Sequence, residues 1–276
     1  MAYHTILVHL DDGPTCARRL EVATRLAREH GSHLIGLAPT GQLDIPIDVA
    51  STLLEPGYLL ATRHHLRELA RLACEEFEAQ AGAAALSSFE ACIDEADHAA
   101  SVIANARGAD LVVVGQSDLN APRGVVNRDL PELVVLGSGR PVLVLPFAGQ
   151  FDTLGQRALA AWNDSREAAR AFADALPLLQ RALQVTVVTQ RPPGAAAPPA
   201  LHKLDTWLAR QGVKAAFSHE VSDLGVGDLL LARASDLSVD LLVMGCCGHS
   251  RLAERVLGGA TRSLLEQMTV PVLMAH

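Results

Sequence analysis

A duplicated strand signature constrains the fold of this 276-residue chain more than any other feature. The apolar run 110–115 (DLVVVG) recurs at 240–245 (DLLVMG), an offset of 130 residues (240 minus 110). The segment Pro141-Val-Leu recurs at the same offset as Pro271-Val-Leu, and residues 5–11 are similar to residues 157–163. Self-similarity over such a distance indicates that one structural unit occurs twice. We refer to the two halves as the first and second copy.

Each copy alternates short apolar strands with segments of helical periodicity. Continuous apolar strands separated by helices are typical of parallel sheets covered on both faces. The expected strands are 6–10, 32–37, 88–93, 111–114 and 141–145, then 158–162, 184–189, 214–221, 240–244 and 270–274. The expected helices are 15–30, 59–81 and 97–107, then 165–181, 200–211, 226–236 and 259–268.

The pattern predicts two tandem flavodoxin-like (Rossmann-like), doubly wound α/β domains, each with a five-stranded parallel sheet. We place them at residues 1–148 and 153–276, with a linker near 148–154. The proline-initiated last strand of each copy is a short apolar edge that favours pairing. We therefore expect an intrachain pseudo-dimer about a pseudo-two-fold axis, and homodimer formation stays open. The first copy is longer, and we expect its extra residues in a surface connection within 45–67.

Composition and charge exclude several functional classes. The formal net charge is −8 and no run of Lys or Arg occurs, which argues against binding to nucleic acid or to an anionic membrane surface. The first residues lack the basic and apolar pattern of an export signal. Five cysteines at irregular spacing do not suggest a disulfide framework. We expect a cytoplasmic protein without structural disulfides.

A ligand site is expected in the second copy, where the strand order of a doubly wound sheet reverses. There the first strand ends at Trp162-Asn163 and the fourth at Met244-Gly245, and backbone N–H groups at the following helix start favour an anion. The candidate ligand-binding residues are Trp162, Asn163, Met244, Gly245, Gly248, His249, Gly258, Gly259, Ala260 and Thr261. The alternative is that the glycines only permit close packing of strand and helix.

The first copy has lost this loop. Asp118 stands where the second copy has Gly248, and Arg128-Asp129 replaces Gly258-Gly259. Both aspartates would repel a phosphate, which Arg123 and Arg128 would only partly offset. We therefore expect a phosphorylated ligand to bind the second copy alone.

The spacing of Gly245, Gly248 and Gly258 resembles the nucleotide loop of the universal stress protein family. The segments 248–250 (GHS), 257–262 (LGGATR) and 270–273 (VPVL) strengthen the resemblance, which covers the whole chain as two family domains. It implies a stress-response protein that binds ATP, with or without Mg²⁺, and regulates a protein partner not identified by the sequence. In ATP-binding members the first strand ends in Asp and the last glycine precedes Ser or Thr. Here Asn163 and Gly259 occupy those positions, whereas the first copy retains Asp11.

Two other functions remain open at this point: a nucleotide-free scaffold or interaction protein, and a slow ATP hydrolase. Fast hydrolysis would require a phosphate-binding lysine and a magnesium carboxylate, but only Arg251, Arg255 and Arg262 lie near the loop. We therefore assign no catalytic residues. Cys246-Cys247 suggests either a redox or soft-metal site or small residues in a tight loop, and we favour the latter. No metal ligands are assigned.

Overall fold

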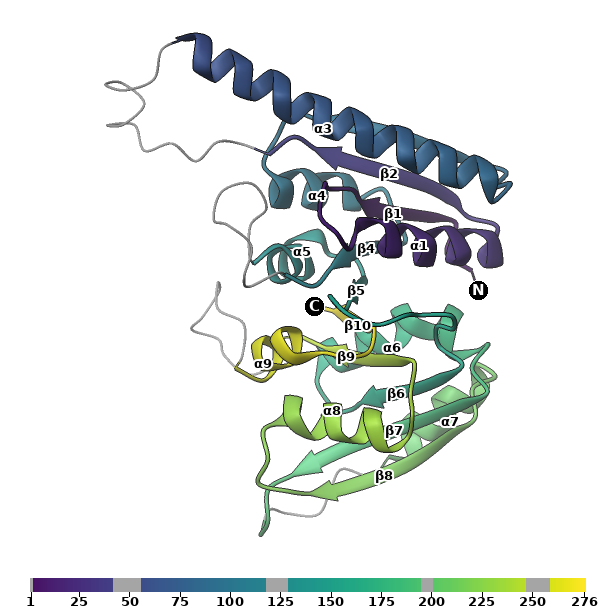
Figure 1. Cartoon of the computed structure of the whole chain (residues 1–276). Helices are drawn as coiled ribbons and strands as arrows, with labels where there is room; N and C mark the ends of the chain where they lie inside the picture. Colours follow the sequence, from purple (N-terminus) through teal and green to yellow (C-terminus); the bar gives the residue numbers. More distant parts are fainter. Residues whose placement is uncertain (1, 42–55, 118–128, 195–200, 247–258) are drawn as a thin grey trace. The chain divides into compact units, whose positions relative to one another are not determined.

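The computed structural model describes residues 2–41, 56–117, 129–194, 201–246 and 259–276. Contacts between residues divide the chain into a first unit, residues 2–138, and a second unit, residues 139–276. Each unit alternates strands and helices, as Figure 1 shows. Among the described residues, no helix has the length and apolarity needed to cross a membrane.

The first unit is a parallel sheet with strand order β3-β2-β1-β4. Helices α1 and α3 pack together, as do α4 and α5, so that helices cover both faces of the sheet (Figure 1). Its elements are β1 (Thr5–His9), α1 (Cys16–His30), β2 (His33–Pro39), α3 (Pro56–Ala83), β3 (Phe89–Asp94), α4 (His98–Ala106), β4 (Leu111–Gly115) and α5 (Leu130–Ser138).

The second unit repeats this arrangement. Its strand order is β5-β10-β9-β6-β7-β8, so β8-β7-β6-β9 corresponds to β3-β2-β1-β4. Its elements are β5 (Val142–Leu145), β6 (Arg157–Ala161), α6 (Arg166–Leu179), β7 (Gln184–Arg191), α7 (His202–Arg210), β8 (Ala215–Val221), α8 (Val226–Asp236), β9 (Leu241–Gly245), α9 (Gly259–Gln267) and β10 (Val272–Ala275). The predicted tandem, doubly wound α/β fold class is confirmed.

The two Pro-Val-Leu strands pair with each other, as the sequence predicted. Strand β5 runs antiparallel to β10, with Leu143 opposite Leu273, whereas the other strand pairs of this unit are parallel. All four residues of each strand are buried. Because of this pairing, residue contacts group β5 with the second unit. The repeat boundaries 1–148 and 153–276 remain a prediction.

The extra length of the first copy is partly helical, which corrects the expectation of a surface connection alone. Helix α3 spans 28 residues, whereas its counterpart α7 spans nine. It begins at Pro56 rather than at residue 59. Proline is compatible with the first helical position because the N–H group it lacks would have no partner within the helix.

Candidate functional site

In both units the polar candidates lie where the central parallel strands end. Strand β6 pairs with β7 on one side and with β9 on the other, and β1 pairs in the same way with β2 and β4. The chain therefore leaves the sheet in opposite directions from neighbouring strands. This is the switch point at which doubly wound sheets bind ligands.

In the second unit, the end of β9 and the start of α9 are held together. Cys246 follows β9 and is fully buried, and its Sγ lies 4.0 Å from Oγ1 of Thr261 in the first turn of α9. The backbone N–H of Cys246 donates to the carbonyl oxygen of Ala275 in β10 at 2.9 Å. Cys246 and Thr261, which flank the glycine-rich segment, are thus held together at the end of β9. Residues 247–258 of this segment, including Cys247, Gly248, His249 and Gly258, lie outside the described residues.

Trp162 and Asn163 follow β6 at this edge. The indole ring of Trp162 packs against the Phe172 ring of α6, with centroids 5.3 Å apart and a T-shaped geometry. Asn163 is exposed, and its Oδ1 accepts a hydrogen bond from the Ser165 N–H at 3.2 Å. Trp162 therefore contributes packing to α6, whereas the amide group of Asn163 is accessible to a ligand.

The glycines and Met244 have different structural roles. A Cβ atom at Gly245 would lie 2.4 Å from the backbone nitrogen of Ala168 and 2.4 Å from the backbone carbon of Glu167, so close packing with α6 requires this glycine. Gly259 is exposed, and among the described residues no atom outside its chain neighbours and its own helix backbone lies within 4 Å of such a position. Met244 is buried in the core at 6% exposure. Ala260 lies in the first turn of α9, next to the buried Thr261.

The first unit contains a buried polar cluster, formed by His9, Asp11, Arg19 and His98, that we did not predict. Arg19 is 2% exposed; its Nε donates to the carbonyl oxygen of His9 at 2.7 Å, and its guanidinium lies 2.8 Å from Oδ2 of Asp11. The side chains of His9 and His98 are joined by a hydrogen bond of 2.8 Å between Nε2 and Nδ1. Among the described residues, no group of three His, Cys, Asp or Glu has the geometry of a metal site.

The charges of this cluster are fixed by burial and by pairing. Burial lowers the pKa of His9 to about 3 and also lowers the pKa of His98, so both imidazoles are neutral at pH 7. Burial acts to raise the pKa of Asp11, but the charge of Arg19 outweighs it and the pKa of Asp11 is lowered. The cluster therefore holds one ion pair and two neutral histidines.

We expect the first unit to lose stability as the pH falls below about 6.5. The unfolded chain binds a proton at His9 with a pKa near 6.5, whereas the folded chain does so only near 3. Between these values the unfolded state binds more protons, so the free energy of unfolding falls with pH by up to about 1.4 kcal/mol per pH unit for each such histidine. Amide hydrogen exchange of β1 and β4 at pH 7 and pH 5 measures the loss, and the double variant His9→Gln, His98→Gln should reduce it. An equal pH dependence in the variant would contradict this assignment.

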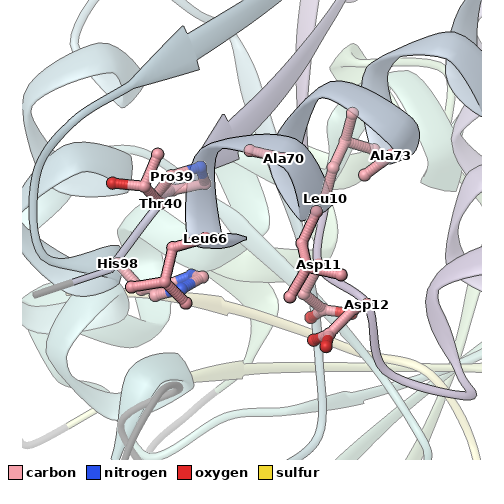
Figure 2. A pocket seen from close by; sticks show the side chains of 10 residues that line it. Leu10, Asp11, Asp12, Pro39, Thr40, Leu66, Ala70, Ala73 and His98 are labelled. Carbon is pink, nitrogen blue, oxygen red and sulfur yellow. The ribbon is translucent and has the colours of Figure 1, made fainter. Parts of the chain in front are cut away.

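A pocket adjoins the cluster beyond the ends of β1 and β2, beneath α3. Figure 2 shows its lining, with His98 on one side and Asp11 and Asp12 on the other. The lining residues are Leu10, Asp11, Asp12, Pro39, Thr40, Leu66, Leu69, Ala70, Ala73 and His98.

One sequence signal could have revealed the cluster. Arg19 lies on the face of α1 that also carries the buried residues Ala23 and Leu26, where an apolar side chain is expected. In the second unit, the equivalent of Arg19 is the buried Ala171 and the equivalent of Asp11 is Asn163, both at the 152-residue offset that relates β1 to β6 (157 minus 5). Both members of the ion pair, Arg19 and Asp11, are thus replaced by uncharged residues in the second unit.

The architecture defines a duplicated, doubly wound α/β protein with a topological switch point in each unit. The model of the universal stress protein family matches residues 2–146 and again residues 155–276. This chain therefore belongs to the universal stress protein family, as a tandem member with two family domains.

Solved structures show the same fold. The chain is similar to a universal stress protein from Archaeoglobus fulgidus DSM 4304, with a TM-score of 0.73 and 17% identity over 98% of this chain and 95% of that chain. A universal stress protein from Pseudomonas aeruginosa UCBPP-PA14 gives a TM-score of 0.62 and 18% identity, covering 99% and 93%. A protein from Pseudomonas aeruginosa PAO1, described as functionally unknown, gives 0.61 and 16%, covering 99% and 92%. No curated protein sequence matches this chain.

Proposed function

We propose that this protein is a regulatory module that binds an adenine nucleotide, with ATP as the candidate, in its second unit. The observation that carries the proposal is the contact between Cys246 and Thr261, which joins the end of β9 to the first turn of α9 beside the end of β6. A helix start at a switch point offers unpaired N–H groups and the positive end of the helix dipole to phosphate oxygens.

The geometry indicates which groups would hold the phosphates. The Thr261 hydroxyl is buried against Cys246, so we assign phosphate contacts to the backbone N–H groups of Gly259, Ala260 and Thr261. The exposed Asn163 is assigned to the ribose. From the sequence, Gly248 and Gly258 complete the loop, and His249 flanks it.

Binding is favoured over rapid turnover. The chain has only two lysines, Lys203 in α7 and Lys214 before β8, and neither lies in the segment that joins β9 to α9. Phosphoryl transfer depends on cations and magnesium ligands around the phosphates. We therefore propose that nucleotide occupancy alters the surface seen by a protein partner. The competing function is a nucleotide-free scaffold.

We expect the substitution Gly248→Asp to weaken ATP binding by about tenfold or more, because it adds a side chain and a negative charge beside the phosphates. Calorimetric titration with ATP and Mg²⁺ measures affinity and stoichiometry, with one site expected per chain. The matched control is Asp118→Asn at the equivalent position of the first copy, which should leave the affinity unchanged. Two sites per chain, or equal affinities of wild type and Gly248→Asp, would refute the assignment. The absence of binding, and of any nucleotide released on denaturation, would support the scaffold.

A further inference from the structure

A histidine side chain holds the end of β9. Nδ1 of His276 lies 3.1 Å from the carbonyl oxygen of Cys246, and the His276 side chain is partly buried. The backbone N–H of Cys246 donates to the carbonyl oxygen of Ala275 at 2.9 Å. Two consecutive residues, 275 and 276, therefore hold Cys246 through both of its backbone polar groups.

The imidazole extends this hold beyond the β ladder. Parallel strands exchange evenly spaced backbone hydrogen bonds, and the pairing of β9 with β10 ends with Gly245 opposite Ala275 (Figure 1). Cys246 follows this last pair and is fully buried, where a carbonyl group without a partner is costly. The bond from His276 supplies that partner.

The acceptor determines the tautomer of His276. A carbonyl oxygen can only accept a hydrogen bond, so Nδ1 of the imidazole must carry the proton. In the neutral imidazole, Nε2 then has only a lone pair. We therefore expect one tautomer of His276, with its proton on Nδ1.

Cys246 connects this histidine to the start of α9. Its Sγ lies 4.0 Å from Oγ1 of Thr261, the third residue of α9, and both side chains are buried. Protein interiors are closely packed, so a shift of Cys246 would also move the first turn of α9. That turn carries the N–H groups of Gly259, Ala260 and Thr261, which are assigned above to the phosphates.

The first copy lacks this donor. At the offset of 130 residues, the equivalents of Thr261 and His276 are Pro131 and Pro146 (261 minus 131, and 276 minus 146). Proline has no N–H group and no donor in its side chain. The donor is therefore absent from the copy that has lost the glycine loop and present in the copy that retains it.

We propose that His276 is a positioning residue for the phosphate site of the second unit. Its Nδ1–H group holds the carbonyl group of Cys246 and thereby sets the position of the first turn of α9. This role rests on the proposed function, because the groups that His276 positions are those assigned to the phosphates. It requires a donor at Nδ1 and does not require a charged imidazole.

Two variants of similar shape separate the donor from the bulk of the side chain. Asn carries an amide N–H group near the position of Nδ1, whereas Leu is branched in the same way and has no donor. Calorimetric titration with ATP and Mg²⁺ should give His276→Asn an affinity within about twofold of wild type. His276→Leu should bind about three- to tenfold more weakly, as expected for the loss of one hydrogen bond.

The matched control is a second histidine of the same unit. His219 lies in β8, and its Nδ1 is 2.8 Å from the Thr189 hydroxyl. His219→Leu also removes a histidine hydrogen bond, but away from β9 and α9, so it should leave the affinity for ATP unchanged.

A measurement without nucleotide tests the hydrogen bond itself. The full-length protein is labelled with ¹⁵N-histidine and studied at about pH 9, well above the ordinary pKa of an imidazole. Nδ1 of His276 should give a pyrrole-type resonance and Nε2 a pyridine-type resonance. The backbone amide resonance of Thr261 should shift in His276→Leu and stay nearly unchanged in His276→Asn.

The outcomes distinguish this role from the proposed function. If the wild type binds no ATP, the proposed function is refuted and the role of His276 with it. If the wild type binds ATP, equal affinity of His276→Leu, or an equal loss in His276→Asn and His276→Leu, would refute the positioning role alone. A proton on Nε2 in place of Nδ1 would also overturn that role, whether or not ATP binds.

Discussion

Replacing Asp11 with alanine is expected to lower the free energy of unfolding of the first unit by about 3–5 kcal/mol, the cost of leaving a buried charge without its partner. Arg19 is 2% exposed, and its guanidinium lies 2.8 Å from the Asp11 carboxylate. Hydrogen exchange of the β1 and β4 amides measures the change in this unit.

The double variant Asp11→Ala, Arg19→Met is the decisive comparison. Removing both charges leaves no unpaired ion, so the double variant should be more stable than Asp11→Ala alone. Asn163→Ala is the matched single control, because Asn163 is exposed and the buried Ala171 stands at the position equivalent to Arg19; its cost should stay below about 1 kcal/mol. If the double variant is less stable than Asp11→Ala, Asp11 does not stabilise the first unit through its ion pair with Arg19.

Gly245→Ala should destabilise the second unit by about 2–4 kcal/mol, through overpacking and loss of a helix cap. The added methyl group would lie 2.4 Å from the backbone nitrogen of Ala168. The same N–H group donates to the capping hydroxyl of Ser165 at 3.1 Å, so α6 would lose its cap as it moves away. Both tryptophans belong to this unit, and Trp162 packs on α6, so urea unfolding followed by tryptophan fluorescence reports the change.

Gly115→Ala provides the matched control in the first unit, which contains no tryptophan and is therefore followed by hydrogen exchange of the β1 and β4 amides. A Cβ atom there would lie 2.5 Å from a terminal guanidinium nitrogen of Arg19 rather than from backbone atoms. A side chain adjusts more readily than a helix backbone, so the cost should be smaller than for Gly245→Ala. An equal loss in free energy of unfolding at the two positions would show that the backbone of α6 also shifts to accommodate the methyl group.

The fold was predictable because the relevant signals are local and repeated. Continuous apolar runs such as 111–114 and 241–244 correspond to the buried strands β4 and β9, and the recurring Pro-Val-Leu identified β5 and β10. The length of α3 was less predictable. Pro56 and Gly57 suggest a loop by composition, yet both are compatible with a helix start and lie in α3.

The candidate sites were predictable only in part. Glycine spacing located the segment between β9 and α9, but the sequence alone does not show that Gly245 faces the backbone of α6. The first-unit cluster was missed because His9, Arg19 and His98 belong to three elements, and only Arg19, on the apolar face of α1, departs from the pattern of its own segment. Only the tertiary structure brings His9 within 2.8 Å of His98, 89 residues away.

The 28-residue helix α3 makes the first repeat longer than the second in one dimension. At a rise of about 1.5 Å per residue it is about 42 Å long. The six-residue strand β3 that it covers is about 20 Å long. Helix α3 is therefore about twice as long as strand β3. The equivalent helix of the second unit, α7, has only nine residues. The two repeats, which share one fold, therefore present surfaces of different length at this position.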